Sequence, residues 1–332
     1  MKNRIILTAI IASAATVARG DHGPGTSAGG FNTQTAETLK ARQIAGAVTF
    51  DWTEFDTPGL GALIGKDHFD LIDRSYLTTF GFSFGATENL QLGLSFGYYA
   101  ADGARQIVHD EPAPAEHGEA PAEGEHHEEA PAAPALATFE PDGWTDLWLT
   151  AKYRVYRGQA GSLSLLGGVK FPVGETRVIN SAGERVEPAS TPGTGAWDGM
   201  AGLAYTLPLT PSLTLDASAQ YTIRGEKYDY RLGNRLDAGA ALAWRIAGGK
   251  EQFPSVHLIG EATVRHIAKS KEGGERDGNT GGTAFFLSPG VRVGFSEHAA
   301  WNVGVQFPIA QELNGDQVET DFRVTTSVNI AF

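Results

Sequence analysis

Several long segments of this sequence alternate between apolar and polar residues, and this period of two constrains the fold more than any other feature. In the last segment one face carries Phe322, Val324, Val328, Ile330 and Phe332, while the other carries Arg323, Thr325, Ser327, Asn329 and Ala331. The same pattern recurs at 147–155, 213–223 and 236–244, each with an aromatic residue near the end of its apolar face. Apolar faces opposed by charged faces, with aromatic residues near the strand ends, are typical of transmembrane β-barrels.

Extending this pattern along the chain predicts one antiparallel up-and-down β-barrel of about twelve strands, with ten and fourteen as alternatives. Each predicted strand has about 11 to 14 residues, which suffices for a tilted strand that crosses a bilayer. The predicted strands are 44–55, 75–86, 90–100, 144–156, 162–173, 195–207, 212–225, 234–246, 255–267, 283–295, 299–310 and 320–332.

The predicted connections alternate in length. Short ones lie at 87–89, 157–161, 208–211, 247–254 and 296–298. Longer ones lie at 56–74, 101–143, 174–194, 226–233, 268–282 and 311–319. Since outer-membrane barrels have short periplasmic turns and long extracellular loops, we expect an even strand number and both termini on the periplasmic side.

The N-terminus has the features of a secretory signal peptide. Lys2 and Arg4 precede an apolar stretch at 5–15, and small residues at Ala18 and Gly20 provide a cleavage site. We therefore expect a signal peptide at 1–20, an N-terminal periplasmic segment at 21–43, and the barrel at 44–332, in the outer membrane of a Gram-negative cell. Whether segment 21–43 plugs the barrel or hangs free is open at this stage.

Charge and cysteine content exclude other classes. Removing the three basic residues of the signal peptide from 26 leaves 23 basic against 39 acidic residues, a net charge of −16. Such an acidic exported chain has no electrostatic reason to bind nucleic acid. The sequence contains no cysteine, so disulfides do not stabilise it. A closed barrel needs none, because every strand is hydrogen-bonded on both sides.

The inward phase of the predicted strands defines candidate lumen-lining residues. Nine are basic: Lys152, Arg154, Lys170, Arg224, Arg235, Arg245, Arg265, Arg292 and Arg323. Six are acidic: Asp51, Asp146, Asp198, Asp216, Asp237 and Glu261. These charges either pair across strands and solvate the interior, or form a mildly cationic selectivity ladder for anions or polar solutes.

The long loop at 101–143 is acidic and rich in histidine. Its candidate metal ligands are His109, His117, His126, His127, Glu125 and Glu128. Interleaved Pro and Ala residues predict an extended or disordered loop, which can capture Zn, Ni or Cu only weakly. The alternative interpretation is a solvated acidic loop that gates the mouth. No cofactor is required by either interpretation.

An outer-membrane hydrolase is a third interpretation, and the sequence gives it little support. His257 lies on the inward phase with Ser255 nearby, while His266 lies on the outward phase. No nucleophile motif surrounds them, so we identify no catalytic residues and predict that the chain is not an enzyme.

Several strings resemble the outer-membrane transporter family named for the MetA pathway of phenol degradation. They are residues 170–175 (KFPVGE), 192–198 (PGTGAWD), 202–205 (GLAY), 228–237 (YDYRLGNRLD) and 32–39 (NTQTAETL). The resemblance covers most of the mature chain and implies an outer-membrane channel or transporter. The family name implies uptake of aromatic compounds, and no family binding residue transfers to this chain.

The leading hypothesis is therefore a passive channel for small solutes, either aromatic compounds or metal ions. The runner-up is a surface protein that captures divalent metal through its His/Glu loop. Expected partners are outer-membrane lipid and lipopolysaccharide, the solutes, and the barrel-insertion machinery, which we expect to recognise the terminal strand ending in Phe332.

Overall fold

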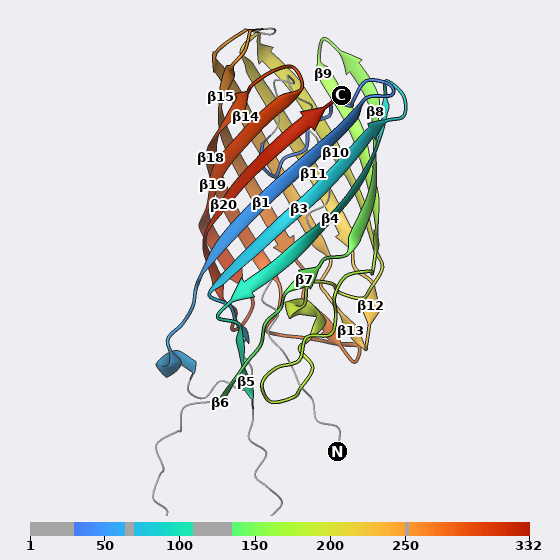
Figure 1. Cartoon of the computed structure of the whole chain (residues 1–332). Helices are drawn as coiled ribbons and strands as arrows, with labels where there is room; N and C mark the ends of the chain where they lie inside the picture. Colours follow the sequence, from blue (N-terminus) through green and yellow to red (C-terminus); the bar gives the residue numbers. More distant parts are fainter. Residues whose placement is uncertain (1–29, 64–69, 109–134, 250–251) are drawn as a thin grey trace, which may run out of the picture.

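Twelve long antiparallel strands form the body of the molecule in the computed structural model, which describes residues 30–63, 70–108, 135–249 and 252–332 (Figure 1). The barrel strands are β1 (Ile44–Asp56), β3 (Arg74–Gly85), β4 (Leu90–Asp102), β8 (Leu147–Gly158), β9 (Gly161–Phe171), β10 (Asp198–Thr210), β11 (Leu213–Ile223), β14 (Arg235–Ala247), β15 (Ser255–Ile267), β18 (Gly282–Gly294), β19 (Ala299–Leu313) and β20 (Glu319–Ala331). All twelve predicted strands are confirmed, with boundaries that differ from the prediction by no more than three residues.

The sheet closes on itself between the first and last strands. Each barrel strand pairs with the next one along the chain, and β1 pairs with both β3 and β20. The closing seam includes hydrogen bonds between Ile44 and Phe332 in both directions, at 3.1 and 2.8 Å. Closure gives the backbone of both terminal strands hydrogen-bond partners, which a strand in lipid requires.

The two ends of the barrel differ, as the connection lengths predicted. Short connections at 86–89, 159–160, 211–212, 248–254 and 295–298 define the short-turn end, where Phe332 also lies. The longer connections at 57–73, 103–146, 172–197, 224–234, 268–281 and 314–318 define the long-loop end (Figure 1).

The long loops fold against one another. They contain the short strands β2 (Asp70–Leu71), β5 (Arg105–Val108), β6 (Ala135–Thr138), β7 (Gly143–Trp144), β12 (Glu226–Lys227), β13 (Tyr230–Arg231), β16 (Lys271–Glu272) and β17 (Glu275–Arg276), and the 3-10 turns η1 (Leu60–Leu63) and η2 (Pro188–Ser190). Buried apolar side chains join these loops, and we call them the loop core: Phe55, Leu63, Leu71, Ile72, Ala104, Ile107, Phe139, Val178, Val186 and Val318. The long-loop end therefore carries a packed apolar core of its own.

Alternation along the strands separates an apolar outer face from a polar inner face. In β8, Leu149 and Tyr153 are 41% and 50% exposed in the absence of lipid, whereas the intervening Lys152 is 6% exposed. The inward side chains are covered because they fill the interior of the barrel. The outward side chains are exposed in the isolated molecule and would contact the hydrocarbon of the bilayer in a membrane.

The N-terminal segment occupies the barrel, which is one of the two alternatives that the sequence left open. We expected residues 21–43 to form a periplasmic segment that either plugs the barrel or hangs free, and the described part, from residue 30, lies among inward-facing side chains of the barrel before it turns into β1. Only its last residues reach the short-turn end, where Ala41 N donates to Glu88 Oε1 at 3.2 Å. The segment is rich in Thr, Asn and Gln, so its backbone and side chains find partners on the polar inner face.

The signal peptide expected at 1–20 lies outside the described residues. Among the residues that are described, no helix is long and apolar enough to cross a membrane.

Candidate functional site

Of the fifteen residues predicted to line the lumen, thirteen lie in the barrel strands on the phase of the covered side chains, and Asp146 and Arg224 lie directly beside the ends of β8 and β11. Eleven of them are buried, and Asp237, Arg245, Arg265 and Arg323 are partly buried. Their position follows from strand phase alone, because residues two apart on a strand point to the same face. Their role in selecting solutes stays a prediction.

A buried charge cluster lies where β9 and β10 approach the long-loop end. Lys170 Nζ lies 3.0 Å from Asp146 Oδ2 and 2.8 Å from Asp198 Oδ2, and it also donates to the Thr194 hydroxyl. Arg224 Nη1 lies 3.1 Å from Asp198 Oδ2. Lys170 and Asp198 are direct cross-strand partners in the β9–β10 register, so the register itself brings opposite charges together.

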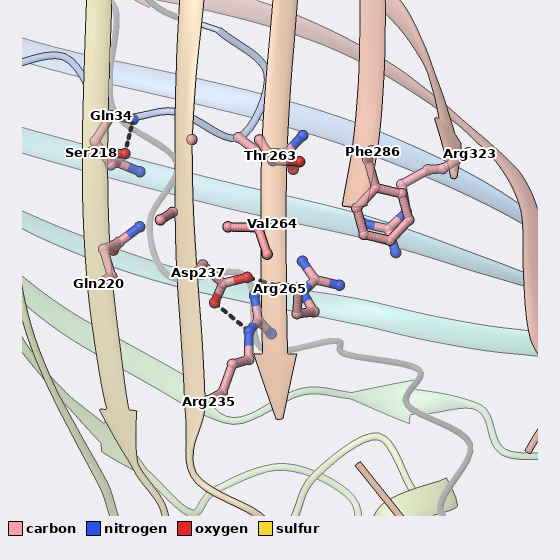
Figure 2. A pocket seen from close by; sticks show the side chains of 13 residues that line it. Gln34, Ser218, Gln220, Arg235, Asp237, Thr263, Val264, Arg265, Phe286 and Arg323 are labelled. Atoms are coloured by element: carbon pink, nitrogen blue, oxygen red, sulfur yellow. Dashed lines mark hydrogen bonds and ion pairs between the residues drawn. The ribbon is translucent and has the colours of Figure 1, made fainter. Parts of the chain in front are cut away.

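A second charge cluster surrounds a small cavity in the lumen (Figure 2). Asp237 accepts hydrogen bonds from Arg235 and from Arg265, the latter at 2.9 Å. Arg323 and the ring of Phe286 also line the cavity. Arg323 Nε donates a hydrogen bond to Thr53 Oγ1 at 3.1 Å. The cavity has a volume of about 50 Å³, enough for a few water molecules or a small anionic group.

The N-terminal segment is bound to the lumen wall at several points. Glu261 accepts hydrogen bonds from the backbone N–H groups of Asn32 and Thr33, at 2.9 and 2.6 Å, and from Asn32 Nδ2 at 2.9 Å. Ala36 N donates to Thr206 Oγ1 at 2.8 Å, next to the Thr206–Asp216 hydrogen bond. This part of the lumen is therefore occupied by the protein's own chain.

The same segment supplies a charge nearer the short-turn end. Glu37 pairs with Arg154 Nη1 at 3.0 Å, and its backbone oxygen accepts from Lys152 Nζ at 3.3 Å. Sequence reasoning missed Glu37 and its neighbours as lumen residues, because the segment has no alternation that would place it on a strand. Its concentration of Thr, Asn and Gln was the available signal.

Three other predicted lumen residues contact a neighbouring strand or turn of the barrel. Asp51 accepts from Thr325 Oγ1 at 2.6 Å, Arg292 Nε donates to Asn302 Oδ1 at 2.6 Å, and Arg245 donates to the Pro211 carbonyl at 2.7 Å. These contacts show inward charges and polar groups satisfying one another across neighbouring strands.

The predicted metal ligands His109, His117, His126, His127, Glu125 and Glu128 lie outside the described residues. Within the described ranges, no three His, Cys, Asp or Glu side chains come together in an arrangement that could hold a metal ion. His257 is buried on the inward face and His266 is exposed, where its Nδ1 lies 2.9 Å from Thr283 Oγ1.

The fold resembles that of a solved outer-membrane protein. Among solved structures, the chain is similar to the COG4313 outer membrane channel from Pseudomonas putida F1, with 15% identity, a TM-score of 0.58, and coverage of 90% of this chain and 98% of that chain. It is also similar to the NanC porin, with 8% identity, a TM-score of 0.41, and coverage of 87% of this chain and 99% of that chain.

Sequence comparison identifies the family. No curated protein matches the chain. A family model described as "Putative MetA-pathway of phenol degradation" matches residues 22–312, which is most of the chain and extends from before β1 to the penultimate residue of β19. The chain belongs to the family that this model describes.

Proposed function

We propose that this protein is an outer-membrane channel for the passive passage of small solutes, with a preference for anions. The observation that carries the proposal is the combination of a closed barrel with a charged interior, in which the lumen cavity is lined by Arg235, Arg265 and Arg323 against a single carboxylate, Asp237. Fixed positive charge on the wall of a pore attracts anions and repels cations.

Planar-bilayer recording tests the proposal. In a KCl gradient, the reversal potential of the wild-type protein should indicate that chloride passes more readily than potassium. Replacing Arg265 and Arg323 with Gln should shift the reversal potential towards cation selectivity, because two positive charges leave the cavity wall. The matched control is Arg185→Gln, which removes an exposed positive charge from a loop outside the lumen. The absence of any current, or equal selectivity in all three proteins, would contradict the proposal.

The cavity wall also favours one class of anion. Phe286 is buried beside the arginines and offers an aromatic face next to cationic groups. We propose small aromatic carboxylates as preferred solutes, with only the carboxylate group entering the cavity beside the arginines, which is consistent with the phenol-degradation pathway named in the family description. In liposome-swelling assays benzoate should enter faster than cyclohexanecarboxylate, and Phe286→Leu should remove the difference.

The proposal treats the chain as a channel and not as an enzyme. Assays of ester and lipid hydrolysis on the purified protein address that point directly. Hydrolysis that survives further purification and is lost on replacement of His257 would show that the protein is a hydrolase and would contradict this proposal.

A further inference from the structure

A cationic patch lies on the surface of the long-loop end, away from the lumen. It consists of Arg177, Arg185 and Lys227 around the ring of Tyr228, and all four side chains are exposed. The Arg185 guanidinium carbon lies 4.2 Å from the ring centroid and Lys227 Nζ lies 4.8 Å from it. We call these four residues the Tyr228 patch.

The turn that presents Tyr228 is backbone-strained. Tyr228 and Asp229 connect β12 to β13, and both have positive φ angles, 55° and 59°. Two-residue hairpin turns of this kind strongly prefer Asn, Asp or Gly, and a Tyr in the left-handed region is uncommon. Strain of this kind persists where the surrounding structure enforces it, and here it holds an aromatic ring beneath two cations.

Three positive charges act on the Tyr228 hydroxyl, and the same hairpin also carries exposed carboxylates at Glu226 and Asp229. A hydrogen bond from Arg185, together with the positive charges of Arg185, Lys227 and Arg177, lowers the pKa of the Tyr228 hydroxyl. The carboxylate of the neighbouring Glu175 accepts a hydrogen bond from the backbone N–H of Arg177 at 2.7 Å, which is a contact within the same loop. Arg185 is held by the ring and by a hydrogen bond to the Thr176 carbonyl at 3.1 Å, so its charge has a defined position.

The patch lies next to aromatic residues at the long-loop ends of β9 and β10. Trp197 is 57% exposed, and its ring centroid lies 4.6 Å from that of Phe171 on the outer face of β9 and β10. Gly195, two residues before Trp197, packs beside both Lys227 and Tyr228: a Cβ on Gly195 would lie 3.3 Å from Lys227 Cγ and 3.8 Å from Tyr228 Cε2. Interfacial aromatic residues lie at the head-group level, so the patch reaches the layer just outside the hydrocarbon.

We propose that the Tyr228 patch binds the phosphate groups of lipopolysaccharide in the outer leaflet of the outer membrane. Arginine and lysine are the side chains that recognise phosphate, and clustered basic residues beside a membrane surface bind anionic head groups. This binding is separate from conduction, so the patch is expected to anchor and orient the barrel without altering its pore.

The test measures binding of bisphosphorylated lipid A to the full-length protein in detergent. The test variant is Arg177→Gln/Arg185→Gln/Lys227→Gln. The matched control is Lys40→Gln/Arg42→Gln/Arg157→Gln, which removes three exposed positive charges near the short-turn end. We expect the dissociation constant to rise at least about tenfold in the test variant and to stay at the wild-type value in the control. Lipid A stripped of its phosphates should bind the wild type as weakly as bisphosphorylated lipid A binds the test variant.

Three results would overturn the proposal. They are equal affinity of the test variant and the control, equal binding of phosphate-free lipid A, and displacement of lipid A by inorganic phosphate at similar concentration, which would indicate a site for the free anion.

Heat-modifiable mobility on gels verifies that each variant is folded. Lys227→Glu is a milder second variant and should weaken binding without affecting assembly. Bilayer conductance of the test variant should equal that of the wild type, which separates this proposal from the proposed channel function.

Discussion

Replacing Lys170 with Met tests whether the buried charge cluster stabilises the barrel near its long-loop end. Methionine keeps an unbranched side chain of similar length but has no charge. Lys170 is 1% exposed and lies within 3.0 Å of both Asp146 and Asp198, which are also buried. After the substitution Asp198 keeps Arg224, but Asp146 keeps only the N–H groups of Gly174 and Thr194 and the Thr194 hydroxyl.

The expected cost follows from these contacts. At separations of about 3 Å, each pair attracts with about 5 kcal/mol at an effective dielectric constant of about 20. Desolvation of the three ions opposes most of this attraction, so the net stabilisation by the intact cluster is small. Removing only the cation leaves the carboxylates buried, and we expect the free energy of unfolding to fall by about 3–5 kcal/mol.

Urea unfolding of the protein in lipid vesicles, followed by tryptophan fluorescence, measures this difference. The double variant Lys170→Met/Asp146→Asn should recover about half or more of the loss, because it removes the carboxylate that has lost its only cation. The double variant Lys170→Met/Asp198→Asn should recover less, because it also deprives Arg224 of its partner. A loss below about 1 kcal/mol for Lys170→Met, or a better recovery with Asp198→Asn, would refute the reasoning.

Two further predictions concern the lumen and the loops. Glu261→Ala removes the acceptor for three N–H donors on Asn32 and Thr33 and should weaken docking of the N-terminal segment by about 3 kcal/mol. Single-channel conductance should therefore rise, and the Thr33 amide should exchange hydrogen faster. Burial raises the pKa of Asp70 in the loop core to about 7. Since the folded loops retain the proton that the unfolded chain releases near pH 4, loop stability should fall as the pH rises from about 4 to about 7, by up to about 4 kcal/mol.

Both predictions have a clear control. Wild-type conductance in Glu261→Ala, with unchanged protection of the Thr33 amide, would show that these hydrogen bonds do not hold the segment. For the loops, hydrogen exchange at the Leu71 and Ile107 amides is measured across pH 5 to 8 and corrected for intrinsic exchange rates. In the wild type the corrected exchange should become faster as the pH rises, and in Asp70→Asn this pH dependence should disappear. Persistence of that dependence in the variant would assign it to another group, for which the nearby Glu187 is the first candidate.

The barrel wall was predictable because the signal is local and repeated. Each strand shows its outward face through residues two positions apart, so the phase that places Lys152 inward and Tyr153 outward needs no knowledge of the neighbouring strands. The alternation of short and long connections then orders the strands, since antiparallel neighbours follow one another along the chain. The pairing of β1 with β20 follows once a bilayer forbids free strand edges.

The content of the lumen was not predictable in the same way. The inward position of Lys170, Asp198 and Arg224 followed from phase, but their mutual pairing depends on register and on side-chain reach across strands. The docking of Asn32 onto Glu261 joins residues 229 positions apart, and the segment that makes it has no periodicity. The Tyr228 patch likewise gathers cations from two loops that share no pattern in the sequence.

The sequence by itself determined that this protein is an antiparallel barrel of about twelve strands with a charged interior, because strand phase is a short-range property and a bilayer accepts few backbone solutions. The tertiary structure fixed the strand number at twelve. Only the tertiary structure decided how that interior is occupied, which charges neutralise one another, and where positive charge reaches the surface. Such contacts depend on distances between residues that are remote in sequence, and no local pattern encodes those distances.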